Sequence, residues 1–135
     1  MRATVMLVAL LVSLATPGYA ADDIAAAQNV VRSQAEALGR DDAATAYSFA
    51  APAIQGMFPE PGAFMDMVRN HYSPVYRHRS FEFGEARNAN GRIEQDVRII
   101  DGNGVPWDAL YTLEQQADGS LKIIGCLLKA VGTSA

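Results

Sequence analysis

The spacing of apolar residues changes near Arg79, and this change constrains the fold more than any other feature. Before it, apolar residues recur every three or four positions, as on one side of a helix. After it they alternate, and turn sequences at 90–91, 101–104 and 118–119 divide the chain into four segments of strand length. The sequence therefore predicts helices followed by a four-stranded antiparallel meander.

About three helices are expected before the strands. Gly39 can end the first, Pro61 is tolerated in the first turn of the third, and Pro74 prevents the third from continuing far. The helices must cover the apolar face of the sheet, so we predict an α+β domain with a curved sheet. The expected helices span 22–39, 41–50 and 61–72, with a short apolar piece at 54–58.

The N-terminal residues predict an export signal. Arg2 carries a single positive charge, an apolar stretch runs from 5 to 15, and small residues precede a cleavage site. We expect a signal peptide over residues 1–20, cleaved between Ala20 and Ala21, and a mature chain that is periplasmic or secreted. The apolar stretch is shorter than the roughly 20 residues that a membrane-spanning helix needs, so no span is expected in the mature chain.

The mature chain has the size and charge of one acidic domain. Without Arg2, ten basic side chains remain against fifteen acidic ones, a formal charge of −5 that disfavours nucleic acid as a partner. About 115 residues suit a single domain. We expect it over 21–131, with a short tail at 132–135. The mature chain carries no motif for ATP or a nicotinamide, so no cofactor is predicted.

Cys126 is the only cysteine, so the domain has no internal disulfide. It lies in the apolar segment 123–128 without a neighbouring base, which favours a small buried side chain over a nucleophile. His71 and His78 are not spaced as metal ligands, and Cys126 belongs to another element. No metal site is predicted.

Residues 67–81 gather arginine, histidine and tyrosine without any acidic residue. Guanidinium and phenol groups suit carboxylate, phosphate or sulfate groups, so this segment could form the rim of a site for a small ligand, including an anionic one. The alternative is a solvated segment whose arginines pair with local acids. The candidate ligand-binding residues are Arg69, His71, Tyr72, Tyr76, Arg77 and, from the third strand, Tyr111.

Glu85 and Gln95 interrupt strand faces that are otherwise apolar. If Glu85 pointed inward, it could share a pocket with His71 and a phenol from Tyr47 or Tyr111, which are groups suited to acid–base chemistry. A strand bulge would instead place either polar residue in solvent. His71 and Glu85 are therefore the candidates for catalysis, while no catalytic set is predicted.

The last strand is apolar on both faces. Alternation assigns its inner face to Leu121, Ile123 and Leu127, and an outer face to Ile124, Cys126 and Leu128 together with Leu110 of the third strand. Helices on one side of the sheet would leave that outer face exposed, so a partner subunit or another part of the chain must cover it. We therefore predict a homodimer through this face.

Six short stretches are distinctive, namely APAIQ at 51–55, MVR at 67–69, YSPVYR at 72–77, WDALYTLE at 107–114, DGS at 118–120 and IGC at 124–126. They resemble an exported bacterial family known as domain of unknown function 4864, and the resemblance covers nearly all of the mature chain. The order of elements also resembles the cone-shaped nuclear transport factor 2-like and cystatin-like domains, which implies a curved sheet around helices and a pocket at the mouth of the cone.

Three functions are compatible with these observations. The preferred one is a non-enzymatic module that binds a small molecule, or an accessory module, with a partly apolar pocket. The second is a small cofactor-independent enzyme of isomerase, dehydratase or hydrolase type, although the chain has no motif of the related enzymes and their roles would rest on analogy of fold. The third is a structural interaction module of the cell envelope.

Overall fold

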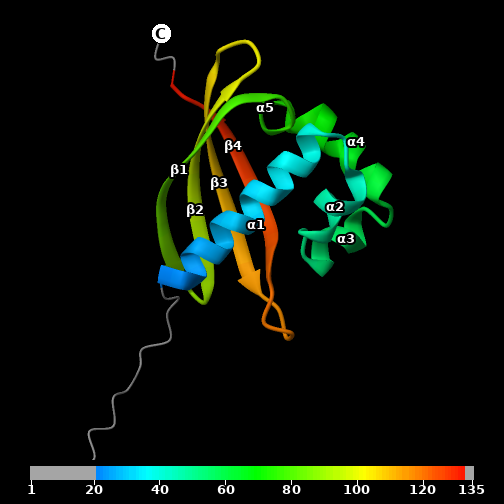
Figure 1. Cartoon of the computed structure of the whole chain (residues 1–135), viewed down its shortest axis with the longest axis vertical. Helices are drawn as coiled ribbons and strands as arrows, with labels where there is room; N and C mark the ends of the chain where they lie inside the picture. The colour runs from blue at the N-terminus through cyan, green and yellow to red at the C-terminus, as the bar shows by residue number, and fades with distance from the viewer. Residues whose placement is uncertain (1–20, 133–135) are drawn as a thin grey trace, which may run out of the picture.

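The computed structural model describes residues 21–132 as five helices followed by a four-stranded sheet (Figure 1). The predicted signal peptide over 1–20 and residues 133–135 of the predicted tail lie outside the described residues. Each strand pairs antiparallel with its neighbour in the chain, so the predicted α+β meander is confirmed. The elements are α1 (Ala21–Gly39), α2 (Ala43–Ser48), α3 (Pro52–Met57), α4 (Pro61–His71), α5 (Ser73–Tyr76), β1 (His78–Ala89), β2 (Arg92–Asp101), β3 (Pro106–Gln115) and β4 (Leu121–Ala130).

Prolines divide the helical part into more pieces than the three predicted. Pro52, Pro61 and Pro74 each lie in the first turn of a helix, where a missing N–H leaves no hydrogen bond unmade. The short apolar piece after the second predicted helix thus forms α3, and α5 is a single turn. Asp42 caps α2 by accepting a hydrogen bond from the Thr45 N–H (3.2 Å). Among the described helices, none has the length and apolar character of a membrane span.

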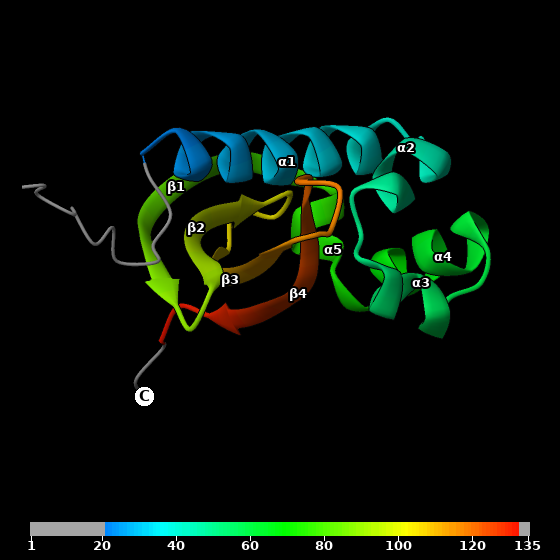
Figure 2. The same cartoon turned by 90° about the horizontal axis from the view of Figure 1, so that it is seen from below.

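The helices form two groups around the sheet (Figure 2). α1 lies across the concave face, where its buried side chains and those of the strands form the core, whereas α2, α3 and α4 lie beyond the edge strand β4. The largest fully buried side chains on the sheet belong to Tyr111, Ile93, Ile99, Leu113, Gln95 and Val97. The second group of helices therefore stands beside the sheet rather than over it.

A short parallel bridge fixes this second group to β4. Ala50, between α2 and α3, pairs with Ile123 of β4. The Ala51 N–H donates to the Ile123 carbonyl (2.8 Å), and the Ile123 N–H donates to the Phe49 carbonyl (2.9 Å). These backbone bonds set the positions of α3 and α4 relative to the edge of the sheet.

A β-bulge in β4 overturns the predicted faces of this strand. Ile123 pairs with Leu113, but Gly125 pairs with the next residue of β3, Thr112. Two steps along β4 therefore correspond to one step along β3, with Ile124 as the additional residue. Regular alternation, on which the sequence prediction relied, does not hold across this point.

The side chains after the bulge exchange faces relative to the prediction. Cys126 pairs with Tyr111 and Leu128 pairs with Ala109, so both lie on the inner face and pack against the core. Leu127, which was expected inside, lies on the outer face and is 71% exposed. The predicted assignment of Cys126 and Leu128 to an outer apolar face is wrong because the bulge shifts the register by one residue.

Cross-strand ion pairs occupy much of the remaining outer face. Arginine and carboxylate side chains from β1, β2 and β3 stand opposite one another there, as expected of a solvated sheet surface. The continuous apolar face that motivated the predicted homodimer and the interaction module is therefore not formed by the described residues. The pairs are Arg87 with Glu94 (2.8 Å) and Asp96 (3.1 Å), Arg92 with Glu114 (3.2 Å), and Arg98 with Asp108 (2.8 Å).

A second bulge, in β1, separates the two polar residues that interrupted the strand faces. The register shifts between Phe83 and Ala86, and Glu85 lies there with its side chain exposed. Gln95 points inward and is fully buried. Its Nε2 donates to the Glu85 carbonyl (3.3 Å), and its Oε1 accepts from Gln28 (3.0 Å). Gln95 thus satisfies the backbone at the bulge rather than serving a pocket.

Candidate functional site

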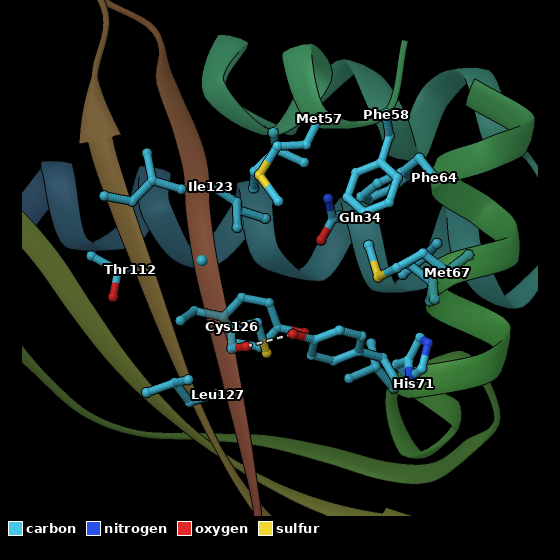
Figure 3. A pocket seen from close by; sticks show the side chains of 18 of the residues that line it. Gln34, Met57, Phe58, Phe64, Met67, His71, Thr112, Ile123, Cys126 and Leu127 are labelled. Atoms are coloured by element: carbon cyan, nitrogen blue, oxygen red, sulfur yellow. Dashed lines mark hydrogen bonds between the residues drawn. The ribbon is translucent and has the colours of Figure 1, made fainter. Parts of the chain in front are cut away.

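A largely apolar pocket of about 500 Å³ lies between the β3–β4 edge and helices α3, α4 and α5 (Figure 3). Its volume falls within the roughly 300–1,000 Å³ of small-molecule sites. Because β4 is an edge strand, the lining includes both inward residues such as Cys126 and outward residues such as Leu127. The larger apolar side chains of the lining include Ile54, Met57, Phe58, Phe64, Met67, Val68, Leu110, Ile123, Ile124 and Leu127.

Two large apolar side chains of this lining are exposed to solvent. Met57 at the end of α3 is 72% exposed and Leu127 of β4 is 71% exposed. Val105, in the turn between β2 and β3, is also exposed, at 42%, but does not line the pocket. Exposed apolar side chains that gather around a concavity are typical of binding sites.

The lining contains no aspartate, glutamate, lysine or arginine. Its polar side chains include Gln34 of α1, Thr112 of β3 and His71 at the end of α4, where the side chain is exposed. A carboxylate or ammonium group placed here would have no oppositely charged side chain of the lining to pair with, which is costly in an apolar site. The pocket therefore suits an uncharged molecule.

Burial favours the neutral forms of three groups around Cys126. The Tyr72 hydroxyl donates to the Cys126 carbonyl (3.0 Å; Figure 3). Burial raises the pKa of the Cys126 thiol to about 12, even though its hydrogen bond with Tyr111 acts in the opposite direction. Burial also raises the pKa of Tyr72, and that of Tyr111 well above its ordinary value. Such a thiol is not a nucleophile at neutral pH.

Two of the three arginines in the 67–81 segment belong to a separate polar group, the Asp41 cluster, which consists of Asp41, Arg69, Tyr76 and Arg77. Arg69 Nη2 donates to Asp41 Oδ1 (3.1 Å), and Arg77 Nη2 lies 3.5 Å from Asp41 Oδ2. The Tyr76 hydroxyl also donates to Asp41 and accepts from Arg77 (2.7 Å). The hydrogen bonds from Tyr76 and Arg69, with the charges of both arginines, hold the pKa of Asp41 below its ordinary value.

The backbone of Asp41 helps to place this carboxylate. Its φ of 58° lies in the left-handed region, which aspartate tolerates better than most residues. The residue forms the turn between α1 and α2, and Arg77 Nη1 donates to the carbonyl of the preceding Gly39 (2.9 Å). The cluster therefore links the end of α1 to α4 and α5.

The profile of the family "Domain of unknown function (DUF4864)" matches residues 20–134, which include both the pocket and the Asp41 cluster. The chain belongs to this family. No curated protein and no solved structure gives a significant match. Membership of DUF4864 supplies no activity, so the function of this domain has to be inferred from its own geometry.

In this DUF4864 domain the six predicted ligand-binding residues fall into two groups. His71, Tyr72 and Tyr111 line the pocket, whereas Arg69, Tyr76 and Arg77 belong to the Asp41 cluster and do not. The arginines thus pair with a local acid, which was the alternative interpretation of the basic segment. The two catalytic candidates are not brought together either, because Glu85 lies on β1, at the other edge of the sheet from the pocket.

The residue that sequence reasoning missed is Gln34. It is 6% exposed and lines the pocket of the DUF4864 domain from α1. The signal was available, because Gln34 lies three residues after Val31 and four before Leu38, in phase with the apolar stripe of the first helix. Among the residues that the structure describes, no group of histidine, cysteine and acidic side chains could hold a metal ion.

Proposed function

We propose that this domain binds a small, uncharged and largely apolar ligand in the pocket beside β4, as a binding module rather than as an enzyme. One observation carries the proposal: Met57 and Leu127 are 72% and 71% exposed at an apolar concavity of about 500 Å³. Exposing such side chains to water is unfavourable, and a ligand that covers them recovers that free energy.

The charge distribution supports an uncharged ligand. Arg69 and Arg77 pair with Asp41, with N–O distances of 3.1 and 3.5 Å, and the pocket lining has neither an arginine to attract an anion nor an acid to attract a cation. The basic segment suggested an anionic ligand, whereas this distribution of charges favours a neutral one.

Binding is favoured over catalysis because the reactive groups of the lining are not activated. Burial raises the pKa of the Cys126 thiol to about 12 and the pKa of the Tyr111 hydroxyl well above its ordinary value, so both groups stay protonated at neutral pH. His71 has no acidic partner in the lining, since Glu85 lies on β1. An acid–base pair of the kind used by pocket enzymes is therefore not assembled.

We further propose that the domain acts after export, as the predicted signal peptide implies. The family match begins at residue 20, which supports a mature chain that starts near this point. The curved sheet around α1, with a pocket beside its last strand, supports the resemblance to nuclear transport factor 2-like and cystatin-like domains.

Titration of the purified protein with the neutral dye Nile red tests the proposal, because emission of the dye rises when it enters an apolar site. We expect saturable binding. Leu127→Asp should weaken it about tenfold, since covering a leucine side chain contributes about 1.5–3 kcal/mol. Leu127 is 71% exposed, so the charge should not disturb the core.

Val105→Asp provides the matched control. Val105 is another exposed apolar side chain on the described surface, yet it does not line the pocket. This variant should bind Nile red as the unmodified protein does. Absence of saturable binding, or an equal loss in both variants, would contradict the proposed site.

A further inference from the structure

Gln34 and Tyr111 are the two polar side chains buried most deeply in the pocket lining. Gln34 projects from α1, behind the space between β4 and α4, and is only 6% exposed (Figure 3). The residues at the exposed end of the pocket, Met57 and Leu127, are 72% and 71% exposed. The pocket thus has an apolar entrance and a single amide at its inner wall.

One hydrogen bond fixes the orientation of this amide. Gln34 Nε2 donates to the Ala46 carbonyl (3.2 Å), and because a carbonyl oxygen can only accept, the NH₂ group must be the one that faces Ala46. Oε1 is thereby turned the other way, and Figure 3 shows it directed into the space between β4 and α4. The orientation follows from chemistry rather than from the similar shapes of the two amide ends.

Gln34 Oε1 accepts no hydrogen bond from the residues that the structure describes. Every enclosed side-chain oxygen and nitrogen among those residues has a partner, so Oε1 reaches the free space of the pocket instead of being sealed in the core. An acceptor in such a position gains most from a hydrogen bond with a donor brought in from outside.

Other polar groups of the pocket are already engaged or less deeply placed. The Tyr72 hydroxyl donates to the Cys126 carbonyl (3.0 Å), and the Tyr111 hydroxyl interacts with the Cys126 thiol, an interaction that affects the pKa of both groups. Thr112 is half-buried and His71 is exposed. This leaves Gln34 Oε1 as the deep group without a protein partner.

Resting on the pocket proposed above, we propose that Gln34 Oε1 accepts a hydrogen bond from a hydroxyl or an amide N–H on the ligand. The donor is neutral, because the lining offers no acid that would balance an ammonium group. The donor end of the ligand enters first and the apolar part remains against Met57 and Leu127. The ligand class is therefore an apolar body with one hydroxyl or amide at its inner end.

Two probes with nearly the same apolar body separate this inference from the general affinity of the pocket. 2-Naphthol carries a hydroxyl donor, whereas 2-fluoronaphthalene has fluorine in its place and cannot donate. Displacement of Nile red by each probe gives their relative affinities. We expect the protein to prefer 2-naphthol by about threefold to tenfold, the range of one net hydrogen bond.

Gln34→Met should remove this preference while leaving the affinity for 2-fluoronaphthalene nearly unchanged. The fold should tolerate the change, because the Ala46 carbonyl keeps a second donor, the Phe49 N–H (3.3 Å). Gln28→Met is the matched control: Gln28 is on the same helix and donates to Gln95 (3.0 Å), but does not line the pocket. The control should keep the preference for 2-naphthol.

Equal affinity of the unmodified protein for the two probes would overturn the role of Gln34 and leave the pocket standing. This comparison needs no variant, so it decides the matter even if Gln34→Met fails to fold. A preference that persists in Gln34→Met would also overturn it. Absence of binding by both probes would overturn the pocket, and the role of Gln34 with it.

Discussion

The Asp41 cluster and the pocket beside β4 differ in whether their groups have partners. In the cluster, one carboxylate, two guanidinium groups and a phenol bind one another at the surface. In the pocket, Gln34 Oε1 has no partner among the described residues, and Met57 and Leu127 are held in water. The concentration of arginine and tyrosine side chains in the sequence suggested a binding site at the cluster. The acceptor without a partner and the exposed apolar side chains instead indicate a binding site at the pocket.

The two regions also differ in what controls ionisation. In the Asp41 cluster, neighbouring groups favour the charged forms: they lower the pKa of Asp41 and raise that of Arg69. In the pocket, burial favours the neutral forms of Tyr72, Tyr111 and Cys126. Each of the following predictions disturbs one of these two regions.

The largest expected effect concerns the reactivity of Cys126. A rise in the thiol pKa from 9.0 to about 12 lowers the thiolate fraction at pH 8 roughly a thousandfold. Alkylation by iodoacetamide, followed by mass spectrometry, should be slower by about that factor in the folded protein than in the protein unfolded in urea. Equal rates would show that water reaches the β4 side of the pocket freely.

The same shift has a consequence for stability at high pH. The folded state favours the protonated Cys126 thiol. The contribution of this preference to the free energy of unfolding is therefore complete below pH 9 and is lost as the pH rises toward about 12. Cys126→Ala should reduce the loss of stability in that interval, as measured by urea unfolding at pH 8 and pH 10.5.

Filling the pocket should have the next largest effect. Gly125 lines the pocket, and a Cβ atom added there meets nothing within 4 Å. Gly125→Phe should therefore fold, since phenylalanine favours strands, and should weaken Nile red binding at least about tenfold. Gly62→Phe, at the start of α4 and equally unobstructed, is the control that should bind normally. Normal binding by Gly125→Phe would place the dye elsewhere.

The smallest effect is expected from Asp41→Asn. Asparagine tolerates the φ of 58°, so the change removes the charge and keeps the backbone. Stability should fall only slightly, because the ion pairs are exposed, and Nile red affinity should not change. An altered affinity would show that the cluster shapes the pocket.

The pH dependence of this variant tests the role of the charge. The pKa of Asp41 is lowered on folding. The ionised carboxylate therefore stabilises the fold above the ordinary pKa of 3.8, and this stabilisation is lost as the pH falls through the pKa of the folded state. Urea unfolding of both proteins at pH 7 and under acidic conditions should show the difference shrinking in acid. A constant difference would assign the effect to something other than charge.

The strands and turns were predictable because alternation and turn residues are local signals. Asn90 and Gly91 adopt positive φ in the hairpin turn, as a turn of this kind requires. The faces of β4 were not predictable, since Ile124 looks like any other apolar strand residue and only pairing with β3 reveals it as a bulge. Gly125 beside it was the one local hint.

The site was predicted in part. His71 is in phase with Phe64 and Val68 on its helix, and Tyr111 alternates with Ala109 and Leu113 on one strand face, so the sequence carries a local signal for both residues. Gln34 is likewise in phase with the apolar residues of its helix, but a single glutamine at such a position does not by itself indicate a binding site. The exposure of Met57 and Leu127 depends on how α3 and β4 are placed by the bridge at Ala50, which is a tertiary effect.

The bulge at Ile124 also bears on how β4 can vary in length. In a regular strand, loss of one residue reverses every side chain beyond it. Here the strand already contains one residue more than its partner needs, so removal of Ile124 would restore regular pairing and leave Cys126 and Leu128 facing inward. β4 can thus shorten at this point without changing the faces of Cys126 and Leu128, although the pocket would lose Ile124 from its lining.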